Sequence, residues 1–281
     1  MATIDLHLFE LGGPGPSLLF LHNLNGSHRN YLDVFSILRR HCHLYALDFR
    51  GHGQSAWQPP YKIRNYADDV MKFIENEVDE PIFLCGHSLG GLVASFVAFK
   101  KPELVGALLL EDPPFFADHQ NEPHRSVAVQ RFAELQTILI AHQDRHAEAS
   151  ELEPVIAEWP IASQASATYL QTYGKKRVTQ MALEIHQADP RTLDPVLEGD
   201  LFDAQSVEHI LSNIRCRCHL LAADASLGGV LRSKEIELVS SLIPDCSYEV
   251  IDGVGHDIHV ARPELYARKV LDLLSEVKAL A

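Results

Sequence analysis

The sequence has few cysteines and no long apolar run. Its five cysteines are dispersed and odd in number, which favours reduced thiols over a disulfide framework. No stretch approaches the roughly 20 apolar residues of a membrane-spanning helix. The N-terminus also lacks the basic start and apolar centre of a secretory signal. We therefore expect a cytoplasmic protein without a membrane partner.

Positive charge is scarce as well. The chain carries 24 lysines and arginines against 38 aspartates and glutamates, a formal net charge of −14. Such a surface repels phosphate backbones, so we expect no nucleic-acid partner. The apolar fraction of 46 % and the charged fraction of 22 % are typical of a globular chain. A length of 281 residues suits one α/β domain with an insertion.

Short apolar runs bounded by polar or turn residues predict buried strands. Six such runs span residues 17–22, 42–49, 82–85, 107–110, 218–223 and 247–251. Segments with helical periodicity separate most of them, including residues 29–40, 66–78 and 263–280. This alternation predicts an α/β fold with a mostly parallel central sheet flanked by helices. Residues 3–11 would add a short edge strand.

One interval, residues 113–210, contains no convincing strand. Helical patterns cover residues 125–144, 163–174 and 178–188, and prolines separate them. We predict a core formed by residues 1–112 and 211–281, with a helical cap inserted between two strands. Because open α/β sheets bind ligands beyond the carboxyl ends of their strands, this cap would cover the binding site.

The segment CGHSLGGLVASF contains a candidate nucleophile, Ser88. Gly86 and Gly90 flank it at two positions before and after, an apolar strand precedes it, and a helical pattern follows. A nucleophile elbow requires small residues at these positions in a strand–turn–helix context. Ser55, in GHGQS, lacks both the second glycine and the helix. We therefore expect Ser55 to stabilise a turn and Ser88 to be the nucleophile.

Four motifs together resemble the α/β-hydrolase family, in its serine-nucleophile branch with a helical cap. They are His22-Asn23, the DFRGHGQS segment at residues 48–55, GHSLG at residues 86–90 and Gly255-His256, in the family's order over nearly the whole chain. The resemblance implies the α/β-hydrolase fold. It also implies that His256 is the base, because a serine hydroxyl needs a partner that accepts its proton.

The acid of the triad is less clearly marked. In the family it usually follows the strand predicted at residues 218–223, commonly as Gly-x-x-Asp. Here Asp224 comes two residues early, and Ser226 occupies the expected position. We expect Asp224 to be the acid, presented by a reshaped loop. Asp112 and Glu111 are alternatives, because some relatives take the acid from the end of an earlier strand; otherwise they link the core to the cap.

Two backbone N–H groups are candidates for the oxyanion hole. One belongs to Leu89, the residue after the nucleophile. The other belongs to Leu24, on the loop after the first apolar run. Relatives have glycine where this chain has Asn23. Because asparagine tolerates positive φ better than most residues, we expect the loop to keep its shape.

A serine at the elbow predicts an acyl-enzyme mechanism. We expect a hydrolase without a metal or organic cofactor that cleaves a carboxylic ester or lactone of a small, mostly apolar substrate. The cap contains aromatic residues that would either line an apolar pocket or pack the cap itself: Phe115, Phe116, Phe132, Trp159, Tyr169 and Tyr173.

Other functions fit the same residues. A C–C bond hydrolase or a cofactor-free perhydrolase of the haloperoxidase type would use the same triad, and a non-catalytic ligand-binding protein would keep the pocket alone. His142 and His146 lie four residues apart but lack the glutamate of a zinc-protease motif, so a solvated helix face is expected. The cap and an exposed sheet edge would each allow a homodimer.

Overall fold

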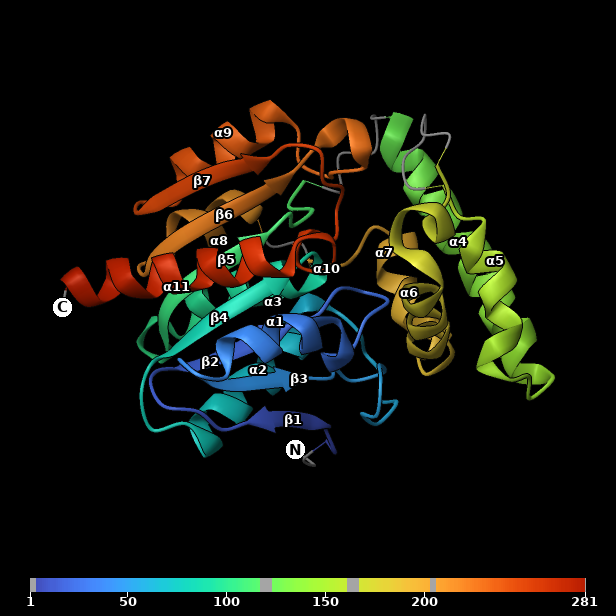
Figure 1. The fold of residues 1–281 in the computed structure, drawn as a ribbon, viewed down its shortest axis with the longest axis horizontal. Coiled ribbons are helices and arrows are strands. Elements are labelled where there is room, and N and C mark those ends of the chain that lie inside the picture. Colours follow the sequence, from blue (N-terminus) through green and yellow to red (C-terminus); the bar gives the residue numbers. More distant parts are fainter. Residues whose placement is uncertain (1–3, 117–122, 161–166, 203–205, 281) are drawn as a thin grey trace.

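The computed structural model describes residues 4–116, 123–160, 167–202 and 206–280. Seven strands form one sheet in the order β1-β3-β2-β4-β5-β6-β7 (Figure 1). Their bounds are β1 (Leu8–Leu11), β2 (Ser17–Leu21), β3 (His43–Leu47), β4 (Ile82–His87), β5 (Val105–Glu111), β6 (Arg217–Ala223) and β7 (Cys246–Ile251). β1 is antiparallel to β3, and every other neighbouring pair is parallel. The predicted mostly parallel sheet is confirmed.

All six apolar runs form strands, and β4 and β5 extend beyond their predicted ends. The central strands are almost continuously apolar because helices cover both faces of the sheet. β7 lies at an edge and alternates between partly buried and exposed residues. Of the predicted edge strand at residues 3–11, residue 3 lies outside the described residues, and among residues 4–11 the part that pairs with β3 is Leu8–Leu11.

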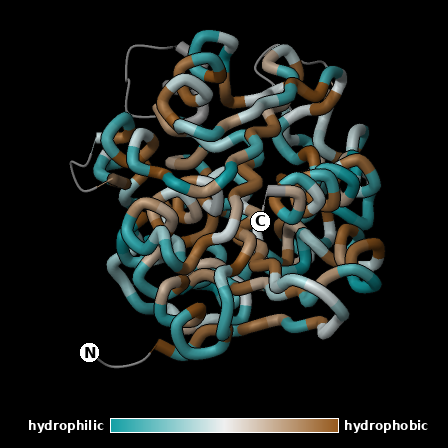
Figure 2. Tube along the Cα trace, turned by 90° about the vertical axis from the view of Figure 1, so that its left-hand side faces the viewer, coloured by the Kyte–Doolittle hydropathy of each residue, from teal (hydrophilic) through white to brown (hydrophobic). Residues whose placement is uncertain are grey.

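Helices pack against both faces of the sheet. One face carries α1 (Leu32–Leu38) and α11 (Pro263–Leu280), which contact each other. The other carries α2 (Ile63–Glu77), α3 (Leu89–Lys100), α8 (Val207–Ser212) and α9 (Ser233–Leu242). In the hydropathy-coloured trace, many of the apolar segments lie in the interior (Figure 2). No described helix combines the length and the apolarity that crossing a bilayer requires.

Between β5 and β6 the described residues contain helices and one isolated bridge, Pro160 with Thr168. Four helices, α4 (Pro123–Asp144), α5 (Glu153–Ala157), α6 (Tyr169–His186) and α7 (Asp194–Leu197), lie together beyond the carboxyl ends of the parallel strands (Figure 1). We call this group the cap helices. α8 follows them in sequence but packs against α3 beside the sheet.

The cap helices differ from the three predicted helical patterns in number and in detail, because the pattern at 125–144 corresponds to α4 and no pattern predicts α5 or α7. The patterns at 163–174 and 178–188 correspond to α6, which is interrupted at Gly174, where φ is 76° and ψ is 171°. Residues 163–166 lie outside the described residues. The remaining short elements are η1 (His28–Tyr31), η2 (Pro102–Leu104), η3 (Ala149–Leu152), η4 (Pro190–Leu193), η5 (Ala225–Leu227) and α10 (Ile258–Ala261).

Candidate active site

Ser88 occupies the sharp turn between β4 and α3. Its φ of 54° and ψ of −116° lie outside the regions that non-glycine residues favour. The Ser88 N–H donates to the Glu111 carbonyl oxygen at 2.9 Å, and the Ser88 carbonyl oxygen accepts from the Gly91 N–H at 2.9 Å. Ser88 is partly exposed, whereas His87 and Leu89 on either side are buried. The turn therefore presents the hydroxyl at the carboxyl end of the sheet.

The two flanking glycines are required by space. A Cβ added to Gly86 would lie 2.3 Å from the Gly90 carbonyl oxygen. A Cβ added to Gly90 would lie 1.9 Å from the Leu21 carbonyl oxygen. Both distances are far below van der Waals contact, and the clashing atoms belong to the backbone. The spacing of these glycines about Ser88 therefore has a steric cause.

His256 forms a short hydrogen bond with Asp112. Its Nδ1 lies 2.7 Å from Asp112 Oδ2. Asp112 is the first residue after β5 and has a φ of 42°. Its buried carboxylate also accepts from the backbone N–H groups of Val230 at 2.8 Å, Leu231 at 3.3 Å and Ala223 at 3.4 Å. Three backbone donors and one ring nitrogen thus fix the carboxylate in place.

This pairing decides the protonation of His256. Burial alone would lower the pKa of His256, but the hydrogen bond and the negative charge of Asp112 outweigh it and raise that pKa above 6.5. Because Nδ1 faces a carboxylate, Nδ1 carries the proton and donates it. In the neutral ring Nε2 is then left as the acceptor. His256 is therefore held in the tautomer that a general base requires.

His87 joins the elbow to the segment that carries His256. Its Nε2 donates to the His256 carbonyl oxygen at 3.0 Å, and the two ring centres are 4.5 Å apart. Burial lowers the pKa of His87 well below its usual value, so its ring is neutral. Since His87 precedes Ser88 directly in the chain, this contact brings the candidate base and the candidate nucleophile to one place.

Asp224, the acid expected from the sequence, makes its side-chain hydrogen bonds to Ser226 and Gly253. Its Oδ1 accepts from the N–H of Ser226 at 2.9 Å and from the Ser226 hydroxyl at 2.6 Å, and its Oδ2 accepts from the Gly253 N–H at 3.1 Å. Asp224 therefore ties its own loop to the loop that precedes His256. Of the three carboxylates expected as candidates, Asp112, named as an alternative, makes the hydrogen bond to the His256 ring, and Asp224 makes its hydrogen bonds elsewhere.

Glu111, the other alternative, has a separate partner. Its carboxylate accepts from the backbone N–H of His259 and lies 2.9 Å from the His259 Nδ1. Both side chains are fully buried. Burial raises the pKa of Glu111 to about 7 and lowers the pKa of His259 to about 3. Both shifts favour the uncharged forms of this pair, whose Glu111 directly precedes Asp112 in the chain.

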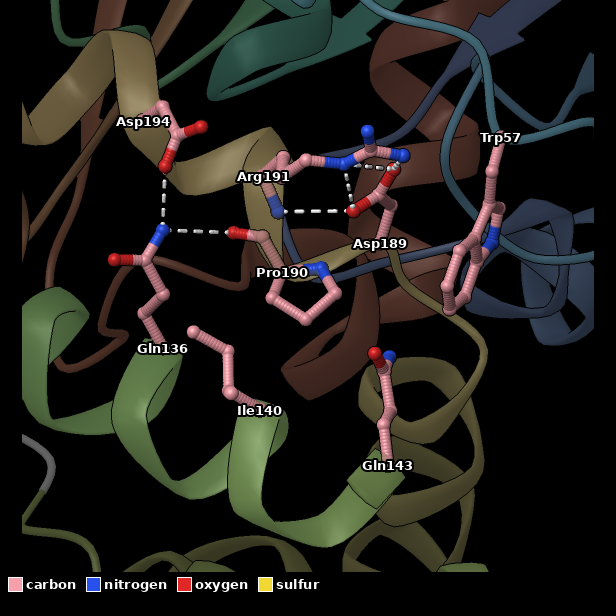
Figure 3. Close-up of a pocket in the computed structure, with 8 residues that line it drawn as sticks. All are labelled: Trp57, Gln136, Ile140, Gln143, Asp189, Pro190, Arg191 and Asp194. Carbon is pink, nitrogen blue, oxygen red and sulfur yellow. Dashed lines mark hydrogen bonds and ion pairs between the residues drawn. The ribbon is translucent and has the colours of Figure 1, made fainter. Parts of the chain in front are cut away.

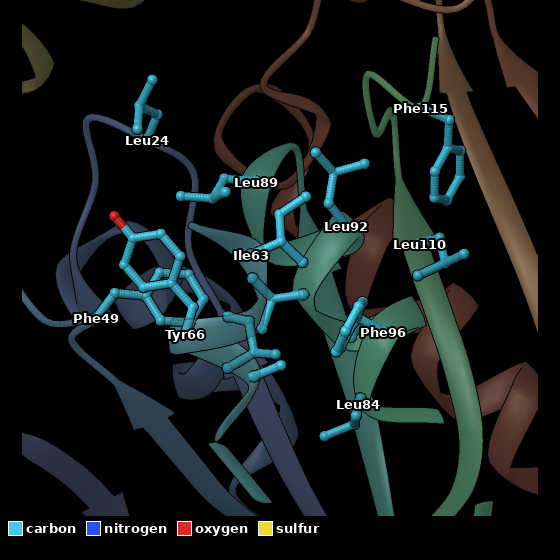
Figure 4. Packing of buried hydrophobic residues seen from close by; sticks show 14 of the residues in the cluster. Leu24, Phe49, Ile63, Tyr66, Leu84, Leu89, Leu92, Phe96, Leu110 and Phe115 are labelled. Carbon is cyan, nitrogen blue, oxygen red and sulfur yellow. The ribbon is translucent and has the colours of Figure 1, made fainter. Parts of the chain in front are cut away.

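The two candidate oxyanion donors lie at the same end of the sheet, with Leu24 on the loop after β2 and Leu89 at the start of α3 (Figure 4). In a trans peptide the N–H points opposite to the preceding carbonyl. The Ser88 carbonyl is held by Gly91, and the Asn23 carbonyl accepts from the Gly26 N–H at 3.1 Å. The directions of the Leu89 and Leu24 N–H groups are therefore fixed.

The expectation that Asn23 replaces glycine because asparagine tolerates positive φ is wrong. Among described non-glycine residues, positive φ occurs at Ser88, Asp112 and His146, and Asn23 is not one of them. Its side-chain oxygen instead accepts from the Asn30 side-chain amide at 3.2 Å. The departure from glycine thus adds a hydrogen bond that sequence reasoning missed, because nothing local marks Asn30 as a partner.

Comparison with known proteins identifies the family of the chain. The sequence pattern of the family described as "Alpha/beta hydrolase family" matches residues 18–269. The chain belongs to the alpha/beta hydrolase family. The predicted fold and the resemblance to an α/β hydrolase are both confirmed, and the protein is an enzyme of the hydrolase class.

Several relatives of this hydrolase carry esterase or lipase names. It is 24 % identical to a Mycoplasma genitalium protein named as an esterase/lipase over 92 % of this chain and 89 % of that one. It is 34 % identical to the lipase LipV of Mycobacterium tuberculosis, but that match spans 41 % of this chain and 44 % of the lipase. The chain thus spans less than half of the lipase's own length.

Solved structures share the fold of this hydrolase. An esterase from a marine microorganism superposes with a TM-score of 0.75 at 20 % identity, covering 96 % of this chain and 99 % of that one. The enol-lactonase of Burkholderia xenovorans superposes with a TM-score of 0.73 at 17 % identity, covering 97 % of both chains. At these identities the likeness concerns the fold alone.

The remaining sequence predictions concern structural residues. The Ser55 hydroxyl donates to the Asp48 carbonyl oxygen at 2.5 Å and accepts from the His7 N–H at 2.9 Å, so Ser55 stabilises a turn as expected. His142 is buried, and its Nε2 lies 3.0 Å from the Glu148 carbonyl oxygen, so the expected solvated face is wrong for that residue.

The cap aromatics of the hydrolase divide by burial. Phe115, Phe116 and Tyr169 are buried in the main apolar cluster, and Phe132, Trp159 and Tyr173 pack partly buried against it. Their packing role is therefore evident.

A separate surface pocket of about 390 Å³ lies between α4, η4 and Trp57 (Figure 3). Arg191 and Asp189 form an ion pair of 2.7 Å in its wall. None of the candidate catalytic residues lines this pocket.

Proposed function

We propose that this hydrolase cleaves a carboxylic ester or lactone through an acyl-enzyme formed on Ser88. The observation that carries the proposal is the 2.7 Å hydrogen bond between His256 Nδ1 and Asp112 Oδ2, beside a serine on a strained strand-to-helix turn. In this proposal Ser88 is the nucleophile, His256 the base and Asp112 the acid.

The reaction follows from these roles. Ser88 Oγ attacks the carbonyl carbon of the substrate while its proton passes to His256 Nε2. Asp112 stabilises the imidazolium that forms, and the N–H groups of Leu89 and Leu24 stabilise the oxyanion. The imidazolium then protonates the departing alkoxide. Water, deprotonated by His256, attacks the acyl-enzyme, and the carboxylic acid leaves as Ser88 regains its proton.

Two further observations support a small, mostly apolar substrate. Leu24, Leu89 and Phe115 belong to one apolar cluster near the elbow (Figure 4). Known proteins similar to this chain include an esterase, an enol-lactonase and a protein described as an N-acyl homoserine lactone degrading enzyme. Their names motivate the choice of substrates to test.

The test is hydrolysis of p-nitrophenyl esters and simple lactones by the wild type and by Ser88→Ala. We expect turnover by the wild type, a burst of p-nitrophenol equal to the enzyme concentration if acyl-enzyme accumulates, and loss of activity in Ser88→Ala. Labelling by a fluorophosphonate, followed by peptide mapping, should locate the adduct on Ser88. A wild type that neither turns over any ester nor takes up the label would contradict the proposal.

C–C bond hydrolysis and perhydrolysis would use the same three side chains. A vinylogous diketone and peroxide-dependent halogenation, assayed beside the esters, separate these reactions by their relative kcat/KM. A protein that binds these compounds without turnover would instead be a ligand-binding member of the family.

A further inference from the structure

The loop after β2, residues 22–27, and the η1 turn that follows it are connected to the cap by buried hydrogen bonds. Ser27 Oγ donates to Glu184 Oε1 at 3.0 Å, and Arg177 donates from its Nη1 to Asn30 Oδ1 at 2.8 Å. Arg177 and Glu184 both lie on α6, and they pair with each other at 3.2 Å. All four of these side chains are buried.

One branch of this network continues to the candidate oxyanion donor. Asn30 Nδ2 donates to Asn23 Oδ1 at 3.2 Å. The Asn23 carbonyl belongs to the same peptide group as the Leu24 N–H. A fixed Asn23 residue therefore fixes the direction of that N–H, since the peptide group is planar. We call the sequence of contacts from Arg177 through Asn30 to Asn23 the Asn30 relay.

The surroundings of this peptide leave it few alternative positions. His22 Nε2 accepts from the Phe49 N–H at 2.9 Å, so the proton of the neutral ring is on Nδ1, which donates to the Asn23 carbonyl at 2.7 Å. A Cβ on Gly26 would lie 2.2 Å from Asn23 Oδ1 and 2.4 Å from Asn30 Nδ2. The Asn23–Asn30 pair thus rests directly on the backbone of Gly26.

We propose that Arg177, a residue of the cap, is a positioning residue for the oxyanion hole and acts through the Asn30 relay on the Leu24 N–H. This inference rests on the proposed hydrolase function. An oxyanion donor contributes to kcat only if it is aimed before the reaction begins, because reorienting it would consume the stabilisation it provides. The relay supplies this preorganisation at the position where the family's glycine is replaced by asparagine.

The ion pair between Arg177 and Glu184 makes a buried arginine possible at this position. An arginine buried without a carboxylate would carry a large desolvation cost, and Glu184 offsets that cost beside it. The Nη1 atom of Arg177 donates both to Glu184 Oε2 at 3.2 Å and to Asn30 Oδ1 at 2.8 Å, and its Nε donates to the Tyr169 hydroxyl at 3.0 Å. Because a guanidinium is planar and presents its donors in fixed directions, these three partners hold Arg177 in one orientation.

The test replaces Asn30, the middle residue of the relay. Asn30→Ala removes the contact to Asn23 and leaves the Ser27–Glu184–Arg177 contacts. Removing one oxyanion donor outright costs roughly 10²–10³ in kcat, so a loosened donor should cost about tenfold. We expect this loss in kcat for a p-nitrophenyl ester, with KM changed less than about twofold, and weaker inhibition by a trifluoromethyl ketone. Thr179→Ala, which removes an exposed contact between α6 and Glu153, is the matched control and should equal the wild type.

The Asn23→Gly variant serves as a second background, which distinguishes a loss of oxyanion-donor positioning from general damage to the structure. Asn23→Gly breaks the relay at its far end, so Asn30→Ala should have no further effect on kcat in that background. If Asn30→Ala folds poorly, Asn30→Asp keeps the oxygen that accepts from Arg177 and loses the donor to Asn23, and it should show the same loss. Additive effects in the double variant, or wild-type kcat in Asn30→Ala, overturn the inference while leaving the proposed function intact. A wild type without esterase activity overturns both.

Discussion

Asp112 and His256 are 144 positions apart in the chain, yet Asp112 Oδ2 lies 2.7 Å from His256 Nδ1. Asp224, much nearer to His256 in sequence, makes its hydrogen bonds to Ser226 and Gly253 instead. The acid of the proposed triad thus comes from the end of β5 rather than from the end of β6.

Replacement of Asp112 by asparagine should therefore inactivate the enzyme while the fold is kept. The amide cannot stabilise an imidazolium, and kcat should fall roughly 10³- to 10⁴-fold. Asp224→Asn, measured with the same ester, should keep kcat within about threefold of wild type, since that residue only ties two loops together. Circular dichroism checks folding. The opposite pattern would return Asp224 to the triad.

The pH dependence of kcat/KM reports on His256. The base must be neutral to accept the Ser88 proton, so activity should rise with pH through the pKa of His256. Asp112 holds that pKa above 6.5, so the ascending limb of the wild-type profile should have an apparent pKa above 6.5. In Asp112→Asn the negative charge beside His256 is lost while His256 stays buried, so the pKa of His256 should fall. The ascending limb of the residual activity should therefore move to lower pH. An unchanged limb would mean that another group titrates.

The buried Glu111 should make stability fall as pH rises. Its pKa is raised from 4.5 to about 7 by burial. Between pH 4.5 and pH 7, Glu111 is ionised in the unfolded state but still protonated in the folded state. The free energy of unfolding therefore decreases from about pH 4.5 to about pH 7, and the contribution of Glu111 is constant above about pH 7. The total is on the order of 3 kcal/mol.

Urea unfolding of wild type and Glu111→Gln at pH 5 and pH 8 measures this contribution. The difference in unfolding free energy between the two proteins should change with pH in the stated direction. Exposed Glu264→Gln serves as the control and should follow the wild type at both pH values. A Glu111→Gln curve parallel to the wild type would show that Glu111 is ionised throughout.

Gly90, two positions after Ser88, should not accept a methyl group. In Gly90→Ala the new Cβ would lie 1.9 Å from the Leu21 carbonyl oxygen, so the backbone of the elbow must shift. We expect a loss of about 2–4 kcal/mol in stability and loss of activity. Gly106→Ala on β5 meets its nearest atom, on the Phe83 ring, at 3.5 Å and should change stability by less than about 0.5 kcal/mol. Equal unfolding midpoints for the two variants would exclude the steric explanation.

Sequence reasoning succeeds where the deciding contacts are local. The apolar runs identify the strands because helices cover both faces of the sheet, and Gly86 marks the elbow because the Gly90 carbonyl oxygen of the same turn crowds it. The acid depends on contacts between the ends of β5 and β6, where Val230 and Leu231 supply N–H groups to Asp112. Adjacent carboxylates such as Glu111 and Asp112 look alike in sequence, and the fold alone directs one to His259 and the other to His256.

The Asn30 relay lies beyond sequence reasoning for the same reason. Asn30 and Arg177 are 147 positions apart, and neither belongs to a motif of the family. The sequence shows that Asn23 replaces the family's glycine, but the role of Asn23 depends on the side chain to which its amide hydrogen-bonds. A local rule about φ gave the wrong explanation, because the residue serves as an acceptor.

The position of Asp112 also bears on how such enzymes diversify. The chain leaves the sheet for the cap at the very next residue, while the Asp112 carboxylate is anchored by backbone groups at and after the end of β6. A foreign insertion joined after Pro114 would leave the acid and the base undisturbed. It would lose Arg177 and Glu184, however, and with them the partners of Asn30 and Ser27. Under the proposed function, exchange of insertions between relatives is thus tolerated by the proposed triad but constrained by the loop that carries the Leu24 N–H, so a transplanted insertion must bring its own anchor for that loop.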